Sequence, residues 1–234
     1  MLVLGIESST PVASVALVGQ EGLVAEFTLN IGLTHSEQLL PMIAELIEEA
    51  RVSTGQLEGI AIASGPGSFT GLRIGMATAK ALSQGKGLPL IAVPTLEALA
   101  TTQSTSNMLI APLMNARKSE VYTALYRFHS QKLEQIEPVQ AISPQEWVKC
   151  LAAHKEKIVF LGDGVHVYQD TWNQLGELAV YPPSIMQGVR GSTVALLGRQ
   201  SLLAGEADDL YKLKPFYLRP AEAQLKKQRL LQGK

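Results

Sequence analysis

The sequence predicts an α/β fold built from two similar lobes. Short apolar runs typical of strands alternate with helical segments along the chain. The 234 residues suffice for one or two domains, and 46% of them are hydrophobic, so the chain can bury a substantial core. The opening pattern recurs near the middle, because residues 2–18 align without a gap with residues 110–126. An internal duplication is therefore expected.

Two α/β lobes that each open with a β-hairpin are the architecture of the actin-like (ASKHA) fold, a duplicated ribonuclease H-like unit. We expect residues 1–105 to form the N-terminal lobe and residues 106–191 a smaller C-terminal lobe. A helix and an apolar anchor within residues 192–220 are expected to return to the N-terminal lobe, before a disordered basic tail at residues 221–234. The polar, uncharged stretch 101–107 is the best candidate for a linker.

The expected elements follow from apolar periodicity and turn residues. The first long helix is expected to begin at Thr34 or Ser36, because Glu37 follows Thr34 by three residues, as in a capping box. Asp163 lies between two glycines and is expected to occupy a turn. We expect strands at 2–7, 12–18, 23–29, 58–63, 88–93, 133–142 and 158–161, and helices from about 34, at 68–83, at 96–101, from 144 and at 192–204.

Composition and charge exclude several classes of protein. The formal net charge of −1 gives no positive field for wholesale nucleic-acid binding. The charge is uneven, since residues 212–234 hold seven basic side chains against Glu222 alone. This basic end either contacts RNA or an acidic partner, or is a solvated terminus. No apolar run reaches the roughly 18 residues of a membrane helix, and residues 1–14 lack a basic signal-peptide start, so we expect a cytoplasmic protein without membrane contact.

Two helices carry more apolar surface than docking on one core requires. In residues 36–51 the apolar positions span an arc of about 160°, whereas a stripe of roughly 100° is sufficient. In residues 68–83 only Arg73 and Lys80 form a polar strip. Gly71, Gly75 and Ala79 form a row with almost no side-chain bulk, which another helix can approach closely.

The apolar surfaces of these two helices predict an interface with another subunit. Burial of both surfaces inside one monomer is the alternative. A charged residue at Leu39, Ile43 or Gly75 is expected to abolish association while the monomer still folds. The residues expected at this interface are His35, Leu39, Leu40, Ile43, Leu46, Ile47, Gly71, Leu72, Ile74, Gly75, Thr78, Ala79 and Leu82.

Two loops are candidates for a phosphate or nucleotide contact. Residues 65–71, the glycine-rich loop, precede a helix whose free N–H groups can hold an anion. The loop lacks the Lys-Ser/Thr of a Walker A motif. A tight turn is the alternative. Glu7 and Ser9 occupy the place of the actin-like phosphate hairpin, which normally carries Asp and Gly, and this argues against catalytic handling of ATP. The candidate contacts are Ser8, Ser9, Thr10, Gly65, Gly67 and Ser68.

No catalytic or metal-binding residues are predicted. The histidines His35, His129, His154 and His166 contain no i, i+4 pair, so a helical His-x-x-x-His metal site is absent. His35 and Ser36 are adjacent on a helix and diverge by about 100°, so they do not form a nucleophile and base. The single cysteine, Cys150, excludes a disulfide framework and is expected to be a packed residue.

Six blocks of sequence resemble the TsaB (YeaZ) family over essentially the whole chain. The block Gly-Pro-Gly-Ser-Phe-Thr-Gly-Leu-Arg within residues 65–75 is the most specific of them. Glu7 and Ser8 depart conservatively from the Asp-Thr that is commoner in the family. The six blocks are residues 5–10, 35–41, 65–75, 95–99, 116–122 and 217–219.

The resemblance implies a non-catalytic subunit of the bacterial machinery that adds threonylcarbamoyl to the tRNA adenosine next to the anticodon. The metal-binding histidine pair of the related catalytic subunit, TsaD, falls here on Thr95 and Leu99, which cannot replace imidazole ligands. The family pairs the helices matching residues 36–51 and 68–83 with TsaD, or with a second copy when TsaD is missing. TsaE joins the assembly, tRNA is bound only through the complex, and ATP or ADP lies at the complex interface without an intrinsic cofactor.

Two alternative functions come from other classes. An ATP-dependent small-molecule kinase of the actin-like superfamily needs a carboxylate-bearing phosphate loop and a general base in the cleft, which Ser9 and the surroundings of Asp163 do not supply. A metallopeptidase, a label that this superfamily has carried, needs the missing histidine pair.

Overall fold

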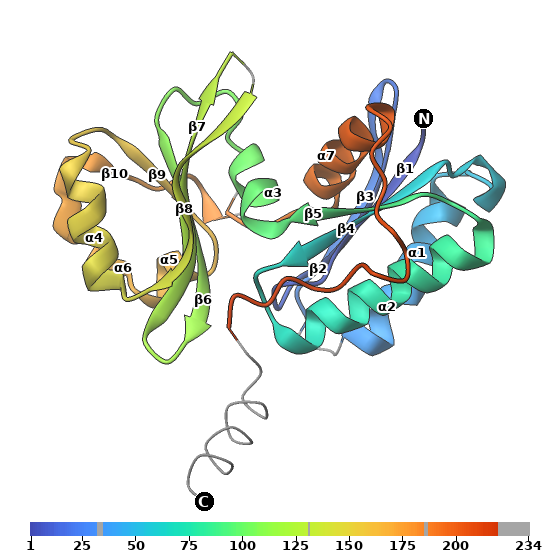
Figure 1. Cartoon of the computed structure of the whole chain (residues 1–234), viewed down its shortest axis with the longest axis horizontal. Helices are drawn as coiled ribbons and strands as arrows, with labels where there is room; N and C mark the ends of the chain where they lie inside the picture. The colour runs from blue at the N-terminus through green and yellow to red at the C-terminus, as the bar shows by residue number, and fades with distance from the viewer. Residues whose placement is uncertain (32–34, 131, 185–186, 220–234) are drawn as a thin grey trace, which may run out of the picture.

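A mixed five-stranded sheet forms the centre of the first lobe in the computed structural model, which describes residues 1–31, 35–130, 132–184 and 187–219. Its strand order is β3-β2-β1-β4-β5 (Figure 1). The elements are β1 (Val3–Glu7), β2 (Ala13–Gly19), β3 (Gly22–Leu29), α1 (His35–Glu49), η1 (Thr54–Gln56), β4 (Gly59–Gly65), α2 (Phe69–Lys86), β5 (Leu90–Pro94) and α3 (Thr95–Thr101).

A second mixed sheet forms the centre of the second lobe, with the strand order β8-β7-β6-β9-β10. Its elements are β6 (Leu109–Arg117), β7 (Glu120–His129), β8 (Lys132–Ile142), α4 (Pro144–Ala153), β9 (Ile158–Leu161), α5 (Gly164–Val167), α6 (Gln169–Trp172), η2 (Asn173–Leu178) and β10 (Ala179–Val180). Helix α7 (Gly191–Leu203) follows.

The two sheets repeat one topology. In each, the first three strands are antiparallel neighbours, and two further strands run parallel to the first strand on its other side. The matching order confirms the predicted duplicated, two-lobed actin-like fold. The predicted linker, residues 101–107, covers the last residue of α3 and the turn before β6.

Local capping residues fix where the helices begin and end. Ser68 precedes α2, and its hydroxyl accepts a hydrogen bond from the N–H of Gly71. Gly87 ends α2 in the left-handed conformation, with φ of 63°. At the start of α4 the Ser143 hydroxyl accepts a hydrogen bond from the N–H of Glu146 and donates one to the Glu146 carboxylate. The cap expected at Thr34 lies outside the described residues.

Helix α7 returns to the first lobe, where it packs on β1, β2 and β4 (Figure 1). Leu4 and Ile6 of β1 point into the core with α1 and α2, so the intervening Gly5 faces α7 on the opposite side of the sheet. A Cβ atom on Gly5 would lie 2.2 Å from the carbonyl oxygen of Gly191. The first sheet is thus covered on one face by early helices and on the other by a helix from the end of the chain.

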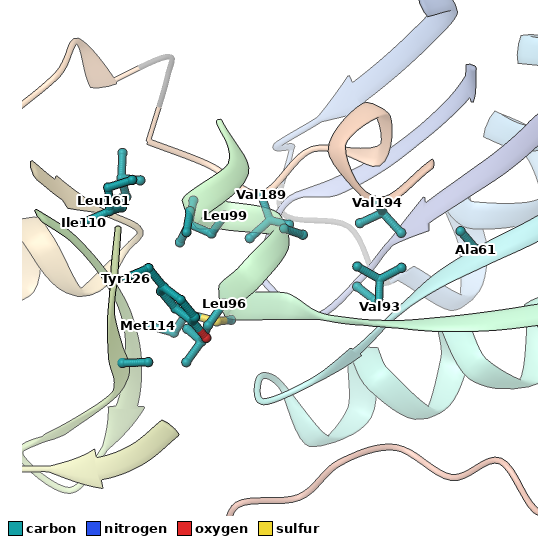
Figure 2. Close-up of a cluster of buried hydrophobic side chains, with 14 of the residues drawn as sticks. Ala61, Val93, Leu96, Leu99, Ile110, Met114, Tyr126, Leu161, Val189 and Val194 are labelled. Atoms are coloured by element: carbon teal, nitrogen blue, oxygen red, sulfur yellow. The ribbon is translucent and has the colours of Figure 1, made fainter. Parts of the chain in front are cut away.

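One apolar cluster joins the lobes. Ala61 and Val93 contribute to it from the first sheet, and Ile110 and Tyr126 from the second (Figure 2). Leu99 of α3 lies between the two groups. The lobes therefore share a continuous core, and α3 is buried within it. None of the helices in the described ranges is long and apolar enough to cross a membrane.

Candidate functional site

The predicted interface residues of α1 and α2 divide between the core and the surface. Five of them pack into the core of the first lobe with at most 3% of their surface exposed. Helix α1 contacts both the sheet and α2, so two elements of the same chain cover its wide apolar arc. These residues are unavailable to a partner, and their assignment to the interface is corrected. They are Leu39, Ile43, Leu46, Leu72 and Ala79.

The small-residue row of α2 faces the β1–β2 hairpin. A Cβ atom on Gly71 would lie 2.0 Å from the backbone oxygen of Ser8, and one on Gly75 would lie 2.1 Å from its Oγ atom. The Ser8 hydroxyl donates a hydrogen bond to the carbonyl of Gly71 at 3.0 Å. The expectation that a second helix approaches this row is therefore wrong, because the hairpin of the same chain occupies it.

A smaller apolar surface remains on the outside of α1 and α2, which lie side by side (Figure 1). Leu40 is 55% exposed although it follows a buried leucine. The predicted interface residues His35, Ile47 and Leu82 are half-buried. We call the surface formed by Leu40, Ala44, Ile74, Ala77, Thr78 and Ala81 the α1–α2 face, whose side chains are exposed or half-buried.

The start of α1 is tied to the same hairpin. The Nε2 atom of His35 lies 2.7 Å from the carbonyl oxygen of Thr10. The ring also packs near Gly71, whose Cβ atom would lie 3.1 Å from it. His35 therefore connects the start of α1 with the hairpin and with α2.

The hairpin that carries the candidate phosphate contacts binds a carboxylate of its own chain. The Oε1 atom of Glu7 accepts hydrogen bonds from the N–H and hydroxyl of Ser9 and from the N–H of Thr10. Glu7 is fully buried, and this burial raises its pKa to about 7. The donors that would hold a phosphate in this hairpin are thus already paired.

The glycine-rich loop packs directly on the hairpin. The N–H of Ser68 donates to the carbonyl of Ser9 at 2.7 Å, and a Cβ atom on Gly67 would lie 2.5 Å from that oxygen. Gly65 has a φ of 118°, which favours glycine, and a Cβ atom there would lie 2.3 Å from the carbonyl of Phe216. Ser8 and Gly65 are buried away from the cleft described next.

A cleft of about 780 Å³ lies between the lobes. It brings together four of the candidate phosphate contacts, Ser9, Thr10, Gly67 and Ser68. The opposite wall comes from the β6–β7 hairpin and from Asp163, whose carboxylate accepts a hydrogen bond from the N–H of Asn115 and fixes the turn there. Four basic side chains line the cleft, and they are Arg73, Arg117, Lys118 and Arg219.

Residues 208–219, the C-terminal strap, connect the lobes across this cleft. Asp208 pairs with the edge strand β5 through its N–H and its carboxylate. The N–H of Phe216 donates to Ser64 at 2.7 Å, and the Tyr217 hydroxyl accepts from Arg73 at 3.0 Å. Arg219 forms an ion pair with Glu120 of the second lobe. The predicted apolar anchor at residues 215–219 is part of this strap, and the tail at 221–234 lies outside the described residues.

The structure also brings together a group of metal-ligating atoms that we did not predict from the sequence. One ligand atom each of Glu137, Cys150 and His154 lies within 4.8 Å of the other two. The expectation of no metal site considers histidine pairs and sites with several cysteines, and it overlooks the i, i+4 spacing of Cys150 on α4 and His154, which directly follows this helix. Glu137 lies on the separate strand β8, so no sequence spacing connects it to Cys150 and His154.

The chain matches known proteins along its length. The sequence profile of a family described as "TsaD: tRNA N6-adenosine threonylcarbamoyltransferase" matches residues 29–227. The tRNA threonylcarbamoyladenosine biosynthesis protein TsaB of Bacillus subtilis is 32% identical over 97% of both chains. The protein of the same name from Escherichia coli is 33% identical over 63% of this chain and 64% of its own.

Solved structures agree with the fold. A crystal structure from Pseudomonas aeruginosa, described as an uncharacterized protein with similarity to peptidase YEAZ, superposes with a TM-score of 0.79 at 24% identity. It covers 93% of this chain and 99% of its own. The profile match and the near full-length relative at 32% identity show that this chain belongs to the TsaB (YeaZ) family of tRNA threonylcarbamoyladenosine biosynthesis proteins, related to TsaD.

Proposed function

We propose that the chain is a non-catalytic subunit of a tRNA threonylcarbamoyladenosine biosynthesis complex and that it binds and activates TsaD through the α1–α2 face. The observation that carries the proposal is the 55% exposure of Leu40 on α1, together with the exposed Ala77 and Ala81 on the neighbouring α2. Exposed apolar side chains on two adjacent helices are typical of a helix-mediated interface. The name of the near full-length relative supplies the pathway.

The interior of the chain supports a role without catalysis. Thr95 and Leu99, which match the metal-binding histidines of TsaD, are fully buried. The hydroxyl of Thr95 accepts a hydrogen bond from the N–H of Gly65, and Leu99 belongs to the core that joins the lobes. Neither supplies an imidazole ligand. The pairing of Glu7 with Ser9 likewise argues against a kinase, because the hairpin donors are occupied.

The remaining parts of the assembly belong to the same proposal. TsaE joins the complex, ATP or ADP lies at the junction of the subunits, and tRNA binds through the complex as a whole. Without TsaD, the α1–α2 face pairs with that of a second copy, because one self-complementary patch can form a two-fold interface.

The proposal is tested by size-exclusion chromatography with TsaD. Leu40→Asp is expected to abolish co-elution, because it places a charge in an apolar interface. The matched control is Leu203→Asp on α7, since Leu203 is 58% exposed and lies on the far side of the first sheet. Far-ultraviolet circular dichroism checks that both variants fold. Co-elution of Leu40→Asp with TsaD at wild-type stoichiometry would overturn the proposal.

A further inference from the structure

The second lobe holds a mixed set of metal-ligating side chains far from the α1–α2 face. Cys150 lies in the second half of α4, and His154 is the residue at its C-terminal end. Residues at i and i+4 lie on the same side of a helix, so the thiol and the imidazole project together. Glu137 reaches them from β8. Helix α4 lies at the outer edge of its lobe, on the side away from α1 and α2 (Figure 1).

The spacing of these groups suits a tetrahedral ion. The Nε2 atom of His154 and the Oε1 atom of Glu137 are 3.5 Å apart. A tetrahedral Zn²⁺ with Zn–N and Zn–O bonds of about 2.0–2.2 Å holds two such ligands about 3.4 Å apart. The thiol completes a set in which all three ligand atoms lie within 4.8 Å of one another. Rotations that bring the thiol to the separation already shown by the other two ligand atoms would complete a tetrahedral set.

The surroundings leave the site accessible. The side chain of His154 is 23% exposed and that of Glu137 is 32% exposed, so an ion can enter and keep water as a fourth ligand. Cys150 is half-buried and packs against the core of the second lobe, which holds the sulfur in place. Sulfur, imidazole nitrogen and carboxylate oxygen together favour Zn²⁺ over Mg²⁺ or Ca²⁺.

We propose that Glu137, Cys150 and His154 form a site for a divalent transition-metal ion of the Zn²⁺ class, which fastens the end of α4 to β8. Binding forms a bond from the metal to sulfur and releases the thiol proton to the solvent. The ion links two elements of one lobe and stabilises that lobe by mass action. The site is independent of the α1–α2 face, so it goes beyond the role proposed above.

The test uses the full chain without an affinity tag, freed of metal with a chelator and then titrated with ZnCl₂ or CoCl₂. We expect one Zn²⁺ per chain by calorimetry and a rise in Tm on binding. Cobalt reports the thiolate through a sulfur-to-metal charge-transfer band, which is unambiguous because Cys150 is the single cysteine.

Two variants and one control decide the outcome. Cys150→Ser is expected to lose the charge-transfer band, and both Cys150→Ser and His154→Ala are expected to weaken Zn²⁺ binding at least about tenfold. His166→Ala, an exposed histidine on α5, is the control and should bind as the wild type does. The absence of Zn²⁺ binding by the wild-type chain, or unchanged affinity in both ligand variants, would overturn the proposal.

Discussion

The Oε1 atom of Glu7 accepts a hydrogen bond from the backbone N–H of Ser9 at 2.7 Å and a second from the Ser9 hydroxyl at 2.6 Å. A third comes from the N–H of Thr10 at 3.2 Å. The other carboxylate oxygen has no hydrogen-bond partner among the described residues. The Glu7 side chain therefore supplies, inside the protein, the oxygen acceptor that an empty phosphate hairpin would take from a ligand.

This arrangement predicts an unusual dependence of stability on pH. Burial raises the pKa of Glu7 from 4.5 to about 7. Between these values the folded chain keeps a proton that the unfolded chain has released, so the Glu7 contribution to stability falls as pH rises. The loss is about 3 kcal/mol and is complete above about pH 7. Glu7→Gln should remove this slope, as measured by urea unfolding at pH 5 and pH 8. An identical slope in the variant would contradict the prediction.

Two glycines of α2 should respond in opposite ways to alanine. Gly71→Ala is expected to destabilise the chain by several kcal/mol, because its Cβ atom would lie 2.0 Å from the backbone oxygen of Ser8. Gly85→Ala is the control, since nothing lies within 4 Å of its Cβ position, and it should stabilise the helix by about 0.5–1 kcal/mol. Thermal and urea unfolding measure both changes. Equal changes in the free energy of unfolding for the two variants would show that the β1–β2 hairpin leaves room for a side chain at Gly71.

Asp208 should fasten the C-terminal strap to the first sheet. Its carboxylate accepts a hydrogen bond from the N–H of Ala92 at 2.7 Å, and its own N–H donates to the carbonyl of Leu90. Asp208→Ala leaves the N–H of Ala92 without this acceptor, and we expect a loss of about 1–3 kcal/mol. Hydrogen exchange at Ala92 should accelerate in the variant. The neighbouring Asp209→Ala is the control, and exchange at Ala92 should not change.

Glu26 should act as the cap of a helix that is distant in sequence. Its Oε1 atom accepts hydrogen bonds from the N–H of Ser192 at 2.9 Å and from the hydroxyl of the same residue at 2.7 Å. Glu26→Ala removes this cap and is expected to cost about 1–2 kcal/mol in the free energy of unfolding. Glu26→Gln keeps an acceptor oxygen and should lose less. If the two variants unfold at the same urea concentration, the carboxylate does not act as a cap.

The sequence was sufficient to predict the fold because its signals are local. Each lobe opens with two apolar runs separated by a polar turn, and the recurrence of this pattern indicates the duplication. Ser143 and Glu146 illustrate the same point, since this helix cap depends on two residues only three positions apart. The predicted strand at 158–161 and the helix from 144 agree with β9 and α4 to the residue at their starts.

The candidate interface is harder to predict, because a wide apolar arc on a helix does not show whether the same chain or a partner covers it. Leu39 and Leu40 are adjacent, yet one is buried and the other is 55% exposed. Part of the surface of α2 is covered by the C-terminal strap, where the Lys80 ammonium donates to the carbonyl of Leu213. A contact across 133 positions leaves no local pattern. The group of Glu137, Cys150 and His154 was missed for a similar reason, since a strand supplies one member.

Helix α7 has a consequence for the order in which the protein can fold during synthesis. The first sheet is complete once residue 94 has been made, but the face that contains Gly5 stays uncovered until residues 191–203 leave the ribosome. The emerging N-terminal half therefore exposes an apolar sheet surface while the whole second lobe is translated, and such surfaces are prone to aggregation. The first lobe is accordingly the earlier to be synthesised and the later to be completed.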